Sequence, residues 1–259
     1  MRVIAITNQK GGVGKTTTTI NLSATLATFG HKVLIVDLDP QGNASTGLGV
    51  EPAARKKTTY DLLIDGVSLA DVAMPTGVEN LSIAPATTDL SSTDVELSQR
   101  DNRVFLLKDA LRETDMAFDY VLIDCPPSLS LLTVNALVAS DSILVPLQAE
   151  FFALEGLSQL MLTIREVRET ANPALRIEGI VLTMHDARNN LSKQVEEDAR
   201  ANLGNLVFQT MIPRNVRLSE APSFALPVIA YDPLSKGSQA YVDLANELLD
   251  RQSPHSEIA

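Results

Sequence analysis

The sequence contains one cysteine, Cys125, no tryptophan and only 4% aromatic residues. A single cysteine excludes an internal disulfide framework and any cysteine-rich metal site. Because no histidine lies near Cys125 in the sequence, we expect it to be a small buried core residue rather than a nucleophile. No apolar run reaches the roughly 18 residues of a membrane-spanning helix, and the chain starts directly with an apolar strand, without a signal peptide. We therefore expect a cytoplasmic protein with a mainly aliphatic core.

Positive charge is also in deficit, with 21 Lys and Arg against 32 Asp and Glu and a net charge of −11. This argues against a protein coated in positive charge, but a local basic patch is still possible because binding follows the local field. The chain has 259 residues, of which 45% are hydrophobic and 20% charged, and single α/β domains of this size are common. Since no linker or repeat is evident, we expect one domain over residues 1–251 and a disordered tail over 252–259.

Apolar strands alternate with amphipathic helices along the chain. The predicted strands are 3–6, 32–36, 81–84, 118–124, 141–146 and 176–183. The predicted helices are 16–29, 59–64, 68–73, 154–170 and 190–203, and 89–112 is predicted to be mostly helical. Such alternation is typical of a doubly wound α/β fold, in which a mostly parallel sheet carries helices on both faces.

A glycine-rich loop with two lysines separates the first strand from the first helix. Its sequence is Lys10-Gly11-Gly12-Val13-Gly14-Lys15-Thr16-Thr17. The glycines allow several N–H groups to point into one concavity at the N-terminal end of a helix, where phosphate binds. Lys15 can reach the β- and γ-phosphate oxygens, and the Thr16 hydroxyl can bind Mg²⁺. The alternative, a flexible turn with two solvated lysines, leaves the strand, loop, lysine, threonine and helix in register unexplained.

Carboxylates follow two of the predicted strands. Asp37 and Asp39 come directly after 32–36, and Asp124 ends 118–124. Burying carboxylates is costly without a partner, and a metal–phosphate site beside them would supply one. An apolar strand that closes on an aspartate is the Walker B arrangement, in which the carboxylate accepts from a Mg²⁺-bound water. For Asp37 and Asp39, the alternative is an Asx-type turn shaped by the proline and glycine that follow.

The loop resembles the deviant Walker A motif of the ParA/MinD ATPases, in which Gln9 stands in place of the usual first glycine and Lys10 is the extra lysine. Segments 182–192 and 212–223 closely resemble the corresponding segments of chromosomal ParA proteins, also called Soj. The resemblance extends over almost the whole chain and is weakest across 50–115.

This resemblance implies an ATPase that partitions chromosomes or plasmids. ATP and Mg²⁺ would join two subunits into a nucleotide-sandwich homodimer, in which Lys10 crosses into the partner's site. Lys10, Lys15 and Asp39 would be the catalytic residues, and Asp39 would orient or activate the attacking water. Thr16, Asp37 and Asp124 would support the metal, Asp37 through its water shell. The residues implied to bind the nucleotide are Lys10, Gly11, Gly12, Val13, Gly14, Lys15, Thr16 and Thr17, with Met184 and Pro213 flanking the adenine.

The resemblance also implies that Arg188 and Arg217 hold non-specific double-stranded DNA, so that the protein would be nucleoid-associated. Composition alone favours an ordinary solvated face here, because the basic residues of 184–231 are interleaved with acids. No arginine finger is evident in the sequence. We therefore expect slow turnover that a ParB-type centromere-binding protein stimulates.

Other interpretations remain open. A MinD-like division-site ATPase would carry a basic amphipathic helix at its C-terminus, whereas residues 253–259 are polar and contain Pro254, so we expect no membrane binding. A relative of the nitrogenase iron protein would need more than one cysteine per chain. A P-loop kinase or synthetase would need an acceptor pocket, which the sequence does not reveal. A nucleotide-dependent scaffold would bind ATP and barely hydrolyse it.

Overall fold

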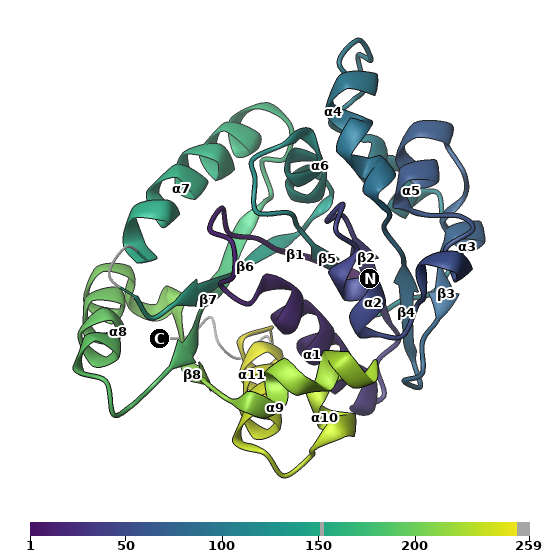
Figure 1. Cartoon of the computed structure of the whole chain (residues 1–259). Helices are drawn as coiled ribbons and strands as arrows, with labels where there is room; N and C mark the ends of the chain where they lie inside the picture. The colour runs from purple at the N-terminus through teal and green to yellow at the C-terminus, as the bar shows by residue number, and fades with distance from the viewer. Residues whose placement is uncertain (151–152, 253–259) are drawn as a thin grey trace.

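The computed structural model describes residues 1–150 and 153–252, and it contains an eight-stranded sheet between two layers of helices (Figure 1). The strand order is β3-β4-β2-β5-β1-β6-β7-β8, and every neighbouring pair is parallel except β3 with β4. The strands are β1 Arg2–Ile6, β2 Val33–Asp37, β3 Met74–Pro75, β4 Leu81–Ala84, β5 Tyr120–Asp124, β6 Ser142–Gln148, β7 Arg176–His185 and β8 Val207–Pro213. This confirms the predicted doubly wound α/β fold.

The helices cover both faces of the sheet, as Figure 1 shows. They are α1 Lys15–Thr28, α2 Asn43–Gly47, α3 Leu69–Val72, α4 Thr93–Glu96, α5 Leu106–Arg112, α6 Leu131–Ala139, α7 Ala153–Thr170, α8 Asn190–Leu203, α9 Val216–Glu220, α10 Val228–Tyr231 and α11 Lys236–Gln252. Short turns of other helical types lie at η1 Pro52–Ala54, η2 Asp61–Asp65, η3 Thr88–Ser92, η4 Gly204–Leu206 and η5 Ala221–Phe224. None of the helices in the described ranges is both long and apolar enough to cross a membrane.

Successive side chains of β1 point to opposite faces of the sheet, so this strand packs against both layers of helices. Val3 and Ala5 belong to the core cluster that includes residues of α5, α6 and α7, whereas Ile4 and Ile6 belong to the cluster with α1 and α11. Because both faces are buried from Val3 to Ile6, this part of the strand is apolar, as expected for parallel sheets.

Segment 89–112 is less helical than predicted. It contains the end of η3, then α4 and α5, with turns from 97 to 105 between the last two. The reason lies in 98–103, which has no apolar residue to pack against the sheet, since short helices depend on such packing. At the other end, Gln252 is still part of α11, and the rest of the predicted tail, 253–259, lies outside the described residues. The prediction of a disordered tail therefore stays a prediction.

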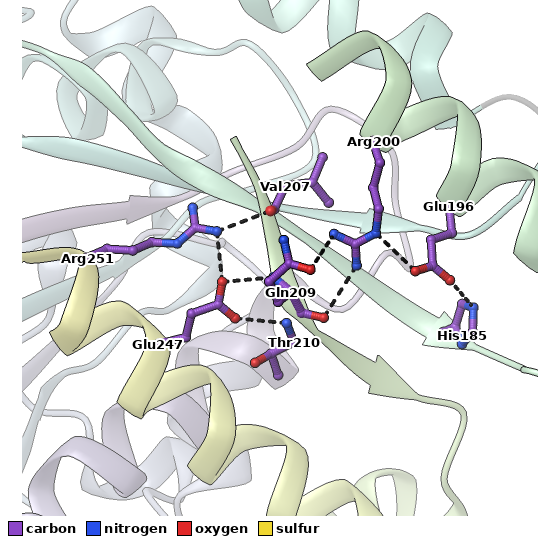
Figure 2. A network of polar contacts seen from close by, with 8 residues as sticks. All are labelled: His185, Glu196, Arg200, Val207, Gln209, Thr210, Glu247 and Arg251. Atoms are coloured by element: carbon purple, nitrogen blue, oxygen red, sulfur yellow. Dashed lines mark hydrogen bonds and ion pairs between the residues drawn. The ribbon is translucent and has the colours of Figure 1, made fainter. Parts of the chain in front are cut away.

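Side chains cover the open edge of β8, the last strand of the sheet (Figure 2). Glu247 of α11 accepts hydrogen bonds from the backbone N–H groups of Gln209 and Thr210, both at 2.8 Å. Arg251 donates to the Val207 carbonyl at 3.1 Å and pairs with Glu247 at 2.8 Å. An edge strand with unpaired backbone groups invites pairing with another chain, and this network blocks that edge.

The same network holds α8 against the ends of β7 and β8 (Figure 2). Arg200 of α8 donates to the Gln209 side chain at 3.3 Å and pairs with Glu196 at 3.0 Å. Glu196 also pairs at 3.2 Å with His185, the last residue of β7. The position of α8 is therefore tied to the last residue of β7 and to the third residue of β8.

Candidate functional site

The candidate site lies at the carboxyl ends of β1, β2 and β5, where ligands bind in doubly wound sheets. The glycine-rich loop leaves β1 here and leads into α1, whose N-cap is Gly14 with φ of 89°. Gly12 has φ of 74°, so both positions favour glycine. The loop is attached to the sheet, because Thr183 of β7 donates to the Val13 carbonyl at 2.8 Å and Asn8 donates to the Pro146 carbonyl at 2.8 Å.

Lys15 is a buried cation at the start of α1, with only 6% of its surface exposed. Burial lowers the pKa of its ammonium group, although Asp124 and Asp39 oppose that shift. Its Nζ donates to the Lys10 carbonyl at 3.0 Å. An ammonium has three donors, and this is the one hydrogen bond that Nζ makes within the described chain. The remaining donors and the helix N-terminus form a site for an anion such as phosphate.

Asp124 lies beside this cation and links the end of β5 to α1. It accepts hydrogen bonds from the hydroxyls of Thr16 at 2.8 Å and Thr19 at 3.0 Å. Burial, together with the negative charge of Asp37, raises its pKa to about 8, while the two threonine hydrogen bonds oppose that shift. The Thr16 hydroxyl and the Asp124 carboxylate are thus neighbours, as a Mg²⁺ site in a P-loop protein requires.

Asp37 is opposite Asp124 in the β2–β5 register. Burial raises its pKa to about 6, and hydrogen bonds from Ser45 partly oppose this. One oxygen accepts from the Ser45 backbone N–H and hydroxyl at 2.9 and 2.7 Å, and the other accepts from the Asp39 N–H at 3.2 Å. Asp37 therefore holds the loop after β2, a role that the sequence analysis did not predict.

Asp39 is 7% exposed, and one of its carboxylate oxygens accepts from the Gln41 N–H at 2.9 Å. The Asx-type turn considered as an alternative is therefore present, and it coexists with the placement of this carboxylate near Lys15. Nowhere in residues 1–150 and 153–252 do three His, Cys, Asp or Glu side chains gather as a metal site by themselves. A divalent cation here needs oxygen ligands from phosphate and water, as Mg²⁺ does in phosphoryl-transfer sites.

Lys10 stands at the entrance of the loop, where its ammonium pairs with Glu150 at 3.2 Å. Both side chains are partly exposed. Glu150 was missed by the sequence analysis, because the contact joins residues far apart in the chain. Cys125 is buried, and burial raises the pKa of its thiol, as expected for a core residue rather than a nucleophile.

A pocket of about 470 Å³ opens beside the loop. Its lining includes Gly14, Thr17, Met184, Pro213, Leu218 and Tyr241. The structure thus brings the two residues implied to flank an adenine next to the phosphate loop, although β7 and β8 lie far from the loop in sequence. Leu218 and Tyr241 were not predicted to belong to this site.

Arg188 and Arg217 lie beyond the ends of the neighbouring parallel strands β7 and β8, at the same edge of the sheet as the glycine-rich loop. Both are paired with carboxylates of their own chain. Arg188 is 92% exposed and pairs with Asp186 at 3.1 Å, and Arg217 pairs with Glu220 at 2.9 Å. The hydrogen bonds from Arg188 lower the pKa of Asp186 to about 2.

Comparisons with known proteins give the following matches. A family model described as an AAA domain matches residues 1–177. The chromosome partitioning protein ParA of Caulobacter vibrioides (strain NA1000 / CB15N) is 54% identical over 254 residues, which cover 97% of this chain and 95% of that protein. The sporulation initiation inhibitor protein Soj of Bacillus subtilis (strain 168) is 53% identical over 247 residues, covering 95% of this chain and 98% of that protein. Among solved structures, cobyrinic acid a,c-diamide synthase from Mycobacterium smegmatis with bound ATP analog and magnesium has a TM-score of 0.85 at 37% identity, covering 97% of this chain and 96% of that chain.

Proposed function

Because the chain belongs to the ParA/Soj family of chromosome-partitioning ATPases, we propose that it hydrolyses ATP with Mg²⁺ and uses the nucleotide to control dimerisation and DNA binding. The observation that carries this proposal is the buried Lys15 at the N-terminus of α1, beside the Thr16–Asp124 pair. These residues fit a Mg²⁺–nucleotide complex, because they provide a cation and helix N–H groups for phosphate and a hydroxyl–carboxylate pair for the metal.

In this proposal Lys15 and the N–H groups of the glycine-rich loop bind the phosphates. Thr16 and Asp124 hold Mg²⁺, and Asp37 supports its water shell while also fixing the loop through Ser45. When bound, the metal neutralises charge that develops on the phosphate oxygens. Asp39 orients the attacking water through its carboxylate, so its loss removes hydrolysis and spares binding. The pocket lined by Met184 and Pro213 takes the adenine.

Lys10 acts in the partner subunit of a nucleotide-sandwich homodimer. To do so it must leave Glu150, and an exposed ion pair of this kind contributes only about 0–1 kcal/mol. Arg188 and Arg217 hold the phosphates of non-specific double-stranded DNA, which would place the protein on the nucleoid. A ParB-type centromere-binding protein is proposed as the partner that stimulates hydrolysis.

We do not extend the activity of the synthase to this chain, because the partitioning proteins are more similar to it in sequence, at 54% against 37% identity. One experiment distinguishes the proposed function from a MinD-like division ATPase and from a scaffold with little hydrolysis. That experiment measures phosphate release by the wild type and Asp39→Ala, with Mg²⁺ and ATP, under three conditions: alone, with duplex DNA plus a ParB-type protein, and with lipid vesicles.

We expect slow phosphate release by the wild type, and DNA plus the ParB-type protein should increase it. Phosphate release by Asp39→Ala should stay near background under the same conditions. No hydrolysis by the wild type under any condition would favour the scaffold. Stimulation by lipid vesicles instead of DNA would favour the MinD-like alternative.

A further inference from the structure

The two arginines of the proposed DNA surface present no net positive charge to solvent. Arg188 makes a two-pronged contact with Asp186, with Nε–Oδ1 and Nη2–Oδ2 distances of 3.1 Å. Arg217 contacts two carboxylates, Glu220 at 2.9 Å through Nη1 and Asp232 at 3.1 Å through Nε. The first group is neutral and the second has a net charge of −1, so a DNA phosphate that approaches either arginine meets a carboxylate already in place.

These carboxylates occupy two of the five N–H donors of each guanidinium. A guanidinium binds phosphate best through two parallel N–H groups, and Asp186 holds such a pair on Arg188 in the same fork geometry. On Arg217, Glu220 and Asp232 hold Nη1 and Nε between them, and Glu220 is itself fixed by a hydrogen bond from the Tyr231 hydroxyl at 3.3 Å. Phosphate that approaches the Nε edge of either guanidinium must therefore displace a carboxylate, whereas the remaining N–H donors of each arginine stay available to it.

We propose that Asp186, Glu220 and Asp232 compete with DNA phosphate for Arg188 and Arg217, and that this competition keeps a single subunit off DNA. The inference rests on the proposed DNA binding and concerns its regulation. Each competing pair is exposed and weak, so removing one carboxylate should strengthen phosphate binding by a small factor, about threefold. A dimer has two such surfaces, and both can contact the same DNA molecule, which raises the overall affinity. The dimer therefore binds DNA detectably, whereas one subunit does not.

The test measures binding of fluorescent duplex DNA of random sequence by Asp186→Asn, Glu220→Gln, Asp232→Asn and the triple variant, over a range of salt concentrations, with and without ATP. Two variants serve as matched controls because they make the same charge change at pairs outside β7, β8 and the segments that follow them. Asp71→Asn breaks the pair with Lys57 (3.6 Å), and Glu169→Gln breaks the pair with Arg165 (2.9 Å). Urea unfolding checks that each variant is folded.

We expect each single variant to bind DNA about threefold more tightly than its control, and the triple variant more than tenfold, with detectable binding in the absence of ATP. The slope of log K against log salt should stay that of the wild type, because the number of neutralised phosphates is unchanged. Variants that equal their controls overturn the inference. Variants that bind more weakly show that the carboxylates position the arginines, which also overturns it. If wild type with ATP binds no DNA at low salt, the proposed DNA binding itself fails, and this inference fails with it.

Discussion

Protonation of the Asp124 carboxyl group should make the stability of the ligand-free protein depend on pH. The pKa of Asp124 is raised from 3.8 to about 8 by burial and by Asp37, so the folded, ligand-free protein holds a proton near pH 7 that the unfolded chain does not. The contribution of this group to the free energy of unfolding is therefore fully present below its pKa in the unfolded chain. This contribution is lost as pH rises through its pKa in the folded protein. Between pH 7 and pH 8 the loss is about 1 kcal/mol, from RT ln(11/2).

Urea unfolding of the ligand-free protein at pH 6.5, 7, 8 and 9 measures this loss, with Asp124→Asn as the reference. Asparagine cannot titrate, and it retains one of the two oxygens, which accept from Thr16 and Thr19 separately. Titrating groups away from this site cancel in the comparison, whereas Asp37, whose charge raises the pKa of Asp124, does not. We expect the free energy of unfolding of the wild type to fall with pH relative to that of Asp124→Asn. A difference that stays constant within about 0.3 kcal/mol, or one that changes in the opposite direction, would refute the assignment of a protonated Asp124.

The same proton should leave when a Mg²⁺–nucleotide complex binds, because the metal favours the ionised carboxylate. Because this pKa lies above 7, Asp124 is mostly protonated at pH 7, so binding should release up to one proton from Asp124. Calorimetry with Mg²⁺-saturated ADP in two buffers of different ionisation enthalpy measures this number. Release that is unchanged in Asp124→Asn would place the proton elsewhere.

Four substitutions test the rest of the site. Lys15→Ala should weaken nucleotide binding by about 3 kcal/mol, or more than a hundredfold, because the cation in the phosphate cradle is lost; wild-type affinity by calorimetry would exclude the P-loop assignment. Lys10→Ala should bind ATP as a monomer, and an unchanged ATP-dependent dimer on a sizing column would contradict the sandwich arrangement. Gly11→Val should also stay monomeric with near wild-type stability, because a Cβ added there meets no atom of its own described chain within 4 Å; its natural control is Gly14→Val, which is strained at φ of 89°. Asp39→Ala should remain an ATP-bound dimer on DNA, and normal phosphate release would remove Asp39 from the mechanism.

The geometry of the glycine-rich loop was predictable because its signals are local. The loop, the strand before it and the helix after it are contiguous in sequence, and α8 has the predicted bounds of 190–203. The helix α11 was missed although its signal was present, since Ala240, Tyr241, Leu244 and Leu248 recur at helical spacing. The strand β8 was also missed, although Val207, Phe208, Thr210 and Ile212 favour a strand. Its edge is completed by Glu247 and Arg251 from α11.

Contacts between distant segments explain the remaining omissions. Ser45 holds Asp37, and Arg55 supports the same loop by donating to the Ala86 carbonyl at 2.8 Å and the Thr46 hydroxyl at 2.7 Å. Neither residue belongs to a motif, and polar side chains of these types are common on loops. Which of them fixes a catalytic loop depends on the fold, so only the structure identifies them.

The arrangement of β7 and β8 explains how one fold can link a nucleotide to a distant surface. Met184 is the last residue but one of β7 and Pro213 is the last residue of β8. Both residues line the pocket, and each is followed four residues later by an arginine of the proposed DNA surface. Because the two strands are parallel and paired near their ends, both arginines leave the sheet beside the pocket. A base that fills the pocket contacts the same short backbone segments that carry the arginines, so its binding energy can bias their position without a long pathway through the core. The His185–Glu196 contact holds the first of these segments to α8, and the pairs with Asp186, Glu220 and Asp232 hold the side chains. Under the proposed function, these are the contacts on which the nucleotide acts.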